Sequence, residues 1–133
     1  QERQEIMVVI DTDIIIWILR GNKDIEELFK KVVIETEGYI FITPIQIAEI
    51  YAGIRQKERL DAENFIESLS VIDINKNIGR LAGDFINRYG RTHNVTMADA
   101  MIAASAKINV FKLWTLNKRH YPMFTEKEFF QPA

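Results

Sequence analysis

The feature that most constrains the fold is the regular alternation of short apolar runs with longer stretches of helical periodicity. The runs are rich in β-branched residues and too short for helices, so we predict strands over 6–10, 39–42, 71–74 and 110–115. The stretches between them predict helices over 13–19, 24–36, from Pro44 onward, 60–69, about 76–90 and 96–108. Strands that alternate with helices form a parallel sheet covered on both faces, so we expect an α/β sandwich. No repeat or flexible linker divides the chain, which predicts one domain over 1–133.

The composition excludes several classes of protein. The 133 residues include no cysteine, which excludes disulfides and thiolate metal sites. Arg20 and Gly21 end the longest apolar run before it reaches the length of a membrane span, and the polar start "QERQE" does not resemble a secretory signal, so we expect a cytoplasmic protein. The net charge of −2 gives no overall basic footprint for nucleic acid.

Two aspartates interrupt the most apolar part of the chain, "MVVIDTDIIIWIL" at residues 7–19. A carboxylate is costly to bury without a partner. Asp11 is the first residue after the predicted first strand, and parallel sheets bind ligands beyond the carboxyl ends of their strands. We therefore expect a functional role for Asp11, whereas Thr12 or Asp13 is expected to cap the helix that follows.

Two further acids stand among apolar residues. Glu49 is the only acid of the helix that opens at Thr43 and Pro44, and this helix is apolar almost all round, so we expect it to be largely buried. The small residues around Glu49 leave room for an ion or a phosphate, while a buried pair with an arginine is the alternative. Asp99 lies in "MADAMIAAS", where the capping-box spacing from Thr96 explains an acid equally well.

Three acids gathered at one edge of a sheet would repel one another unless a cation lies between them. Carboxylate ligands without cysteine favour Mg²⁺ or Mn²⁺. Such an ion activates water and clamps phosphate oxygens, which indicates metal-assisted hydrolysis of a phosphodiester. Spacing alone does not establish that the three acids meet.

Four motifs in order, "VIDTDIIIWILRG", "TPIQIAEIYAG", "MADAMIAASA" and "LWTLNKRHY", resemble those of PIN-domain ribonucleases, and most closely the VapC-type toxins of toxin–antitoxin pairs. The resemblance covers about residues 7–124. It implies a three-layer α/β/α sandwich with a mainly parallel central sheet, and a metal-dependent endoribonuclease that cleaves RNA. It also implies a homodimer and a small antitoxin whose tail blocks the active site.

Carried over motif by motif, the resemblance implies the catalytic residues Asp11, Glu49, Asp99 and Asn117, of which the three acids are the metal ligands. Asn117 falls where many relatives carry a fourth acid, so one negative charge is missing there. Thr115 is expected to be a hydroxyl partner of a carboxylate or of a water, and Asp13 to have a supporting role.

Basic residues beside the proposed site are the expected RNA-binding groups: Lys118, Arg119 and His120. A second basic group, Arg88, Arg91 and His93, precedes the helix of Asp99. The aromatic residues Trp17, Tyr51 and Trp114 are expected in the core. No helix-turn-helix is evident, so no direct DNA binding is expected.

Two alternatives remain. The "DTD" after a strand also resembles haloacid-dehalogenase-like phosphatases, with Asp11 as nucleophile and Asp13 as general acid–base, but that reading leaves Glu49 unexplained. The other is a catalytically inactive binding module, in which Asn117 signals a decayed site. Retention of three mutually repelling acids argues against it.

Overall fold

A four-stranded parallel sheet forms the centre of the molecule in the computed structural model, which describes residues 5–133. The strands are β1 (Val8–Ile10), β2 (Ile40–Ile42), β3 (Ser70–Val71) and β4 (Lys112–Trp114), in the order β3-β2-β1-β4. All four predicted strands are present, each shorter than expected. Residues 1–4, which belong to the predicted domain 1–133 and to the polar start of the chain, lie outside the described residues.

Six α-helices connect and cover the strands, as predicted: α1 (Thr12–Leu19), α2 (Lys23–Thr36), α3 (Pro44–Gly53), α4 (Arg59–Glu67), α5 (Lys76–His93) and α6 (Met97–Asn109). Three short 3₁₀ turns were not predicted: η1 (Gln56–Glu58), η2 (Lys118–His120) and η3 (Glu126–Glu128). In the described part of the chain, no helix is both long and apolar enough to cross a membrane.

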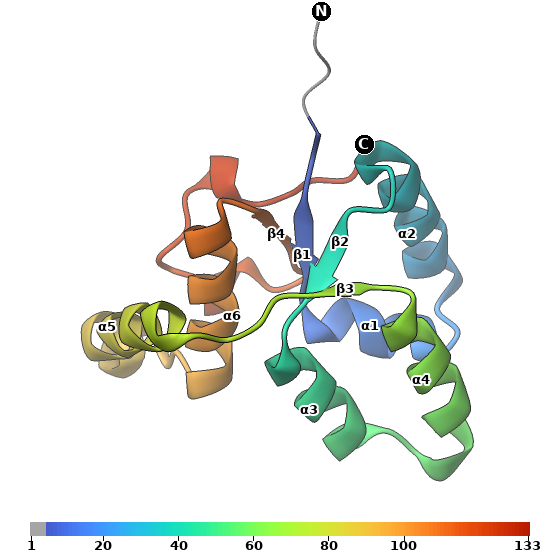
Figure 1. The fold of residues 1–133 in the computed structure, drawn as a ribbon, viewed down its shortest axis with the longest axis horizontal. Coiled ribbons are helices and arrows are strands. Elements are labelled where there is room, and N and C mark those ends of the chain that lie inside the picture. The colour runs from blue at the N-terminus through green and yellow to red at the C-terminus, as the bar shows by residue number, and fades with distance from the viewer. Residues whose placement is uncertain (1–4) are drawn as a thin grey trace, which may run out of the picture.

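The sheet separates two apolar cores, which makes the fold a three-layer α/β/α sandwich. Alternate strand residues point to opposite faces: Val8 and Ile10 join the core shared with α1, α2 and α4, while Val9 and Leu113 join the core shared with α5 and α6. Figure 1 shows α5 and α6 on one side of the sheet and α1, α2 and α4 on the other. The predicted fold class is therefore confirmed.

Strand β1 occupies an inner position in the sheet, and its three residues are fully buried. It pairs with β2 on one side and β4 on the other. Beyond β4, the backbone N–H of Phe130 donates to the Leu113 carbonyl at 2.8 Å, so the C-terminal segment covers that outer edge. The residue that follows β1, Asp11, consequently lies near the middle of the carboxyl edge of the sheet.

Helix α3 is fixed to the end of β1 by its own cap. The predicted capping box of Thr43 and Gln46 is present, and Gln46 Nε2 also donates to the Ile10 carbonyl at 3.1 Å. The expectation that α3 is largely buried is wrong, because its side that carries Ala48 and Ala52 is exposed in the part of the chain that the structure describes. Trp17 was expected in the core but is 49 % exposed.

Candidate active site

Asp11 is held by four contacts at the carboxyl end of β1. Its backbone N–H donates to the Trp114 carbonyl at 2.9 Å, which continues the pairing of β1 with β4. Its carboxylate accepts the Thr12 backbone N–H and the Thr115 hydroxyl, both at 2.8 Å, and is only 7 % exposed. It is approached as well by the Tyr121 hydroxyl. Asp11 itself is the N-cap residue of α1, so the prediction that Thr12 or Asp13 caps this helix is wrong.

The Asp13 carboxylate turns instead toward the loop after β4. Its Oδ2 accepts the backbone N–H of Leu116 at 3.2 Å, while its buried Oδ1 has no hydrogen-bond partner among the described residues. Burial, and then the charge of Asp11, raise the pKa of Asp13 from 3.8 to about 6. The side chain therefore links the start of α1 to the end of β4 and leaves one carboxylate oxygen unsatisfied.

Glu49 reaches the same region from α3. Its Oε1 accepts the Thr12 hydroxyl at 2.6 Å, so its partner is a hydroxyl group and not the arginine of the alternative interpretation. The side chain is exposed along part of its surface. Partial desolvation raises the pKa of Glu49, the Thr12 hydrogen bond opposes that rise, and the charges of Asp11 and Asp99 add to it.

Asp99 stands in the first turn of α6. The Thr96 hydroxyl accepts the Asp99 backbone N–H at 3.1 Å, which caps the helix and leaves the carboxylate directed elsewhere. Asp99 Oδ2 lies 3.9 Å from His120 Nδ1. Asn117 Nδ2 lies 3.0 Å from His120 Nε2, so the two ring nitrogens of His120 face Asn117 and Asp99.

All these side chains line one cavity of about 320 Å³. Its walls are Asp11, Thr12, Asp13, Glu49, Thr96, Asp99, Asn117 and His120. The three acids predicted to meet thus come to one cavity from β1, α3 and α6. Thr115 lies behind Asp11, where its hydroxyl donates to the carboxylate and accepts the Asn117 backbone N–H at 3.0 Å.

Electrostatics show that the cavity is unfavourable for so many negative charges. Burial raises the pKa of Asp11, the hydrogen bonds from Thr115 and Thr12 and the nearby Tyr121 hydroxyl oppose the rise, and the charge of Asp99 adds to it. A cation in the cavity would relieve this repulsion. The carboxylates Asp11, Glu49 and Asp99 and the unsatisfied oxygen of Asp13 suit a hard ion. Within residues 5–133, however, no three acidic or imidazole side chains already converge closely enough to form a metal cluster.

Sequence reasoning missed two contributors to this site. Thr12 positions Glu49 through its hydroxyl. In the sequence, only its place between the two aspartates points to this role. Tyr121 is almost fully buried with its hydroxyl beside Asp11. That hydroxyl forms no hydrogen bond of good geometry within the described residues, yet burial and the nearby carboxylates raise the pKa of Tyr121 well above 10. Its only sequence signal is that it directly follows His120.

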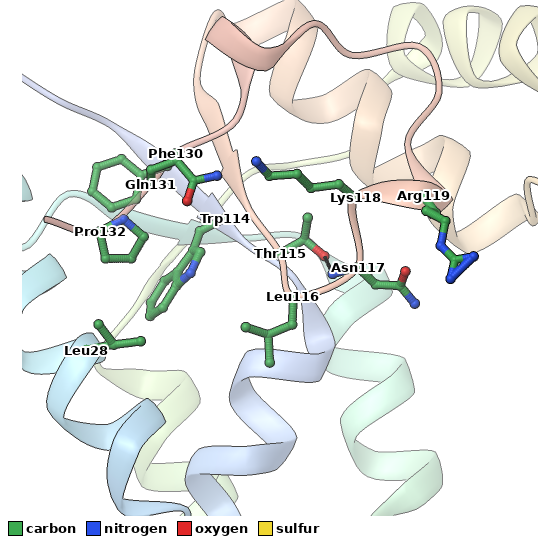
Figure 2. Close-up of a pocket in the computed structure, with 10 residues that line it drawn as sticks. All are labelled: Leu28, Trp114, Thr115, Leu116, Asn117, Lys118, Arg119, Phe130, Gln131 and Pro132. Carbon is green, nitrogen blue, oxygen red and sulfur yellow. Dashed lines mark hydrogen bonds between the residues drawn. The ribbon is translucent and has the colours of Figure 1, made fainter.

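The predicted RNA-binding residues lie around the mouth of the acidic cavity. His120 lines it, and Lys118 and Arg119 line a neighbouring cavity of about 590 Å³ that shares Asn117 with it (Figure 2). Arg119 and His120 also line a third cavity, of about 310 Å³, together with His93, Asn94 and Asn117. Lys118 is partly neutralised by Glu126 at 3.1 Å.

Comparison with known proteins gives a consistent result. The PIN domain model matches residues 8–123. The chain is 34 % identical over 121 residues to Ribonuclease VapC10 of Mycobacterium tuberculosis, and the match covers 90 % of both chains. Ribonuclease VapC19 of the same organism is 31 % identical over 90 % of this chain and 96 % of that protein. A DNA-bound VapBC from Salmonella typhimurium shares the fold, with a TM-score of 0.75, 20 % identity, and coverage of 87 % of this chain and 90 % of that chain.

Proposed function

The chain belongs to the PIN-domain family and is an endoribonuclease related to the VapC enzymes, and we propose that it hydrolyses RNA phosphodiester bonds in the cavity that Asp11, Glu49 and Asp99 line. One observation carries this assignment. Carboxylates separated by up to 88 positions in sequence are brought into one cavity of about 320 Å³, where burial and mutual repulsion raise the pKa values of Asp11 and Glu49. Such an arrangement has a cost for folding, and a bound cation offsets that cost.

We propose that Asp11, Glu49 and Asp99 hold Mg²⁺ or Mn²⁺, with Asp13 and Asn117 as neighbours of the ion. When bound, the ion polarises a phosphate oxygen and lowers the pKa of water, as hydrolysis of a phosphodiester requires. Because no three of these side chains converge before binding, at least one must rotate. Glu49 is suited to that movement, because it is exposed and held by one hydroxyl.

The side chains of the site orient the acids, attract the RNA and supply a proton to the leaving group. The Thr115 and Thr12 hydrogen bonds fix both oxygens of Asp11, so its orientation is set before any ligand binds. Lys118 and Arg119 attract the RNA backbone beside the acids. His120 lines the cavity with Nδ1 toward Asp99. Its ring can donate the proton that the departing ribose oxygen takes up.

A protein partner is part of this proposal. VapBC assemblies from several bacteria share the fold, so we propose that this chain is the toxin of a toxin–antitoxin pair and that a small antitoxin blocks its cavity. The homodimer, the cytoplasmic location and the single domain over 1–133 stay predictions.

Of the two alternatives, the phosphatase has lost its support. Asp13 accepts a hydrogen bond from the Leu116 backbone, and the chain belongs to another family. The inactive binding module and the nuclease differ in metal-dependent RNA cleavage, which can be measured. Only the nuclease requires the acids to bind an ion that supports cleavage.

The deciding experiment combines thermal unfolding with RNA cleavage, each with EDTA and with millimolar Mn²⁺. We expect Mn²⁺ to raise the melting temperature of the wild type and to support cleavage, because ligand binding to the folded state stabilises it. Both effects should be lost in Glu49→Gln. They should be kept in Glu67→Gln, which removes an exposed charge from α4. Stabilisation without cleavage of any RNA would favour the binding module, and no response in the wild type would overturn the metal site.

A further inference from the structure

The cavity of about 590 Å³ beside the acids has a lining unlike that of the acidic cavity. We propose that it binds one nucleobase of the RNA, next to the linkage that is cleaved; this inference rests on the ribonuclease function proposed above. The apolar part of its wall comes from three distant parts of the chain: Leu28 of α2, Trp114 and Leu116 at the end of β4, and Phe130 with Pro132 in the C-terminal segment. A nucleobase is a flat ring with apolar faces, which such a wall accommodates.

The shape of the cavity is visible in Figure 2. In this view the Trp114 ring lies between Leu28 below and Phe130 and Pro132 above. Trp114 is only 3 % exposed, as expected for a core residue, so it closes the bottom of the cavity. Leu116 is 46 % exposed, and its side chain forms the open rim. An exposed leucine beside an active-site asparagine is available to pack against a ligand.

Charge favours a nucleotide over an apolar peptide segment as the occupant. Lys118 and Arg119 are among the ten lining residues, and none of the ten is acidic. Lys118 is held in place by Glu126 at 3.1 Å and by the Phe129 ring, whose centre lies 5.2 Å from the ammonium nitrogen. Among the described residues Arg119 has no ion-pair partner. Cations at the rim of an apolar cavity suit a nucleotide, because they can bind its phosphate while the apolar wall contacts the base.

Polar groups in the wall can read the edge of a base. The side-chain amide of Gln131 supplies donors and an acceptor. Figure 2 shows the Gln131 amide directed toward the same opening as the end of Lys118. These groups distinguish bases by hydrogen bonding, whereas the apolar wall accepts any of the four.

The cavity is joined to the acidic site through three residues. Trp114 accepts the Asp11 backbone N–H, and Thr115 donates to the Asp11 carboxylate while lining the nucleobase cavity. Asn117 lines both cavities. A base in this cavity therefore belongs to a nucleotide adjacent to the phosphate that lies at the acids.

The test measures binding in EDTA, where cleavage does not interfere. The probes are AMP, CMP, GMP and UMP, with ribose 5-phosphate as the probe that lacks a base, and the readout is Trp114 fluorescence in a Trp17→Phe background. We expect at least one nucleotide to bind at least about tenfold more tightly than ribose 5-phosphate, because a base buries apolar surface against the wall of the cavity. Leu28→Phe, which fills the cavity, and Gln131→Ala, which removes a hydrogen-bonding group but keeps the apolar wall, should each reduce that preference. Ile34→Phe makes a similar change on an exposed face of the same helix and should leave the preference for a nucleotide unchanged.

The outcomes separate this inference from the proposed function. Equal binding of ribose 5-phosphate and all four nucleotides would overturn the nucleobase cavity and leave the apolar wall to a protein partner. Unchanged preference in both Leu28→Phe and Gln131→Ala would place the nucleotide elsewhere and overturn it too. Base-dependent binding by a chain that cleaves no RNA would support the cavity and overturn the nuclease.

Discussion

The Thr115 hydroxyl donates to Asp11 Oδ2 at 2.8 Å, although 104 positions separate the two residues in the chain. The same hydroxyl accepts the backbone N–H of Asn117 at 3.0 Å. One buried oxygen atom therefore connects the acid that ends β1 to the loop that carries the basic residues. Its removal would leave a carboxylate oxygen and an N–H group without their partner.

Thr115→Val should lower the free energy of unfolding by about 1–3 kcal/mol, because valine keeps the shape of threonine but leaves both partners unpaired. RNA cleavage should fall with it, since Asp11 loses one of the two bonds that orient it. Chemical denaturation and a cleavage assay measure the two effects. Thr115→Ser keeps the hydroxyl and is the control; equal losses in both variants would show that packing of the methyl group matters more.

Asp11→Asn should reduce RNA cleavage at least about 100-fold, as expected for loss of a charged metal ligand. The melting temperature in EDTA should stay the same or rise, because a buried charge is removed from a cavity of like charges. Initial cleavage rates on labelled RNA and thermal unfolding give the two values. Normal cleavage by this variant would mean that the proposed site is wrong.

Stability without metal should fall as pH rises through 6, in part because of Asp13. Its pKa is raised from 3.8 to about 6 on folding, so between these values the folded protein keeps a proton that the unfolded chain has released. The stabilisation is complete below about pH 3.8 and is lost as pH rises through about 6. Denaturation in EDTA at pH 4.5 and 7.5 should therefore show a fall of about 1–2 kcal/mol that Asp13→Asn lacks. An identical fall in this variant would assign the effect to Asp11 and Glu49, whose pKa values are also raised.

Asn117→Asp should tighten Mn²⁺ binding roughly 3- to 10-fold, because it adds a carboxylate to the wall of the acidic cavity. The same charge should lower the melting temperature in EDTA by adding to the repulsion. Titration calorimetry measures the affinity. Asn117→Ser, which adds no charge, is the matched control, and an Asp variant with wild-type affinity would remove this position from the metal site.

Val110→Gly should raise the free energy of unfolding by about 1 kcal/mol. Val110 ends α6 with φ at +59°, a conformation that is unfavourable for a β-branched side chain, and it is 88 % exposed, so little packing is lost. Thermal unfolding is sufficient to detect the change. A smaller gain is expected for Val110→Ala, whose Cβ retains part of the strain.

The strands and helices could be predicted because each depends on local sequence. The Thr43-Pro44 start with Gln46 three residues after the cap gave the correct first residue of α3, and its capping box is present. The burial of α3 could not be predicted in the same way, because an apolar residue is buried only where another element covers it. Ala48 and Ala52 are exposed in the structure of residues 5–133.

The site was predictable only as a set of candidate residues. Residue type and sequence context identified Asp11, Glu49 and Asp99, and the family motifs supported all three. Side-chain direction was not available from spacing, so Asp13 was taken for a cap although its carboxylate bonds across the molecule to Leu116. Thr12 and Tyr121 were missed for the same reason, since each contributes through a contact that only the folded chain creates.

The strand order β3-β2-β1-β4 has a consequence for synthesis of the protein. Strand β1 precedes its partner β4 in the chain, so a nascent chain holds Asp11 before Trp114 and Thr115 exist to position it. Asp99 and the basic loop at 118–120 also follow Asp11 in synthesis. The acidic cavity is therefore incomplete on the ribosome until the loop at 118–120 has been made.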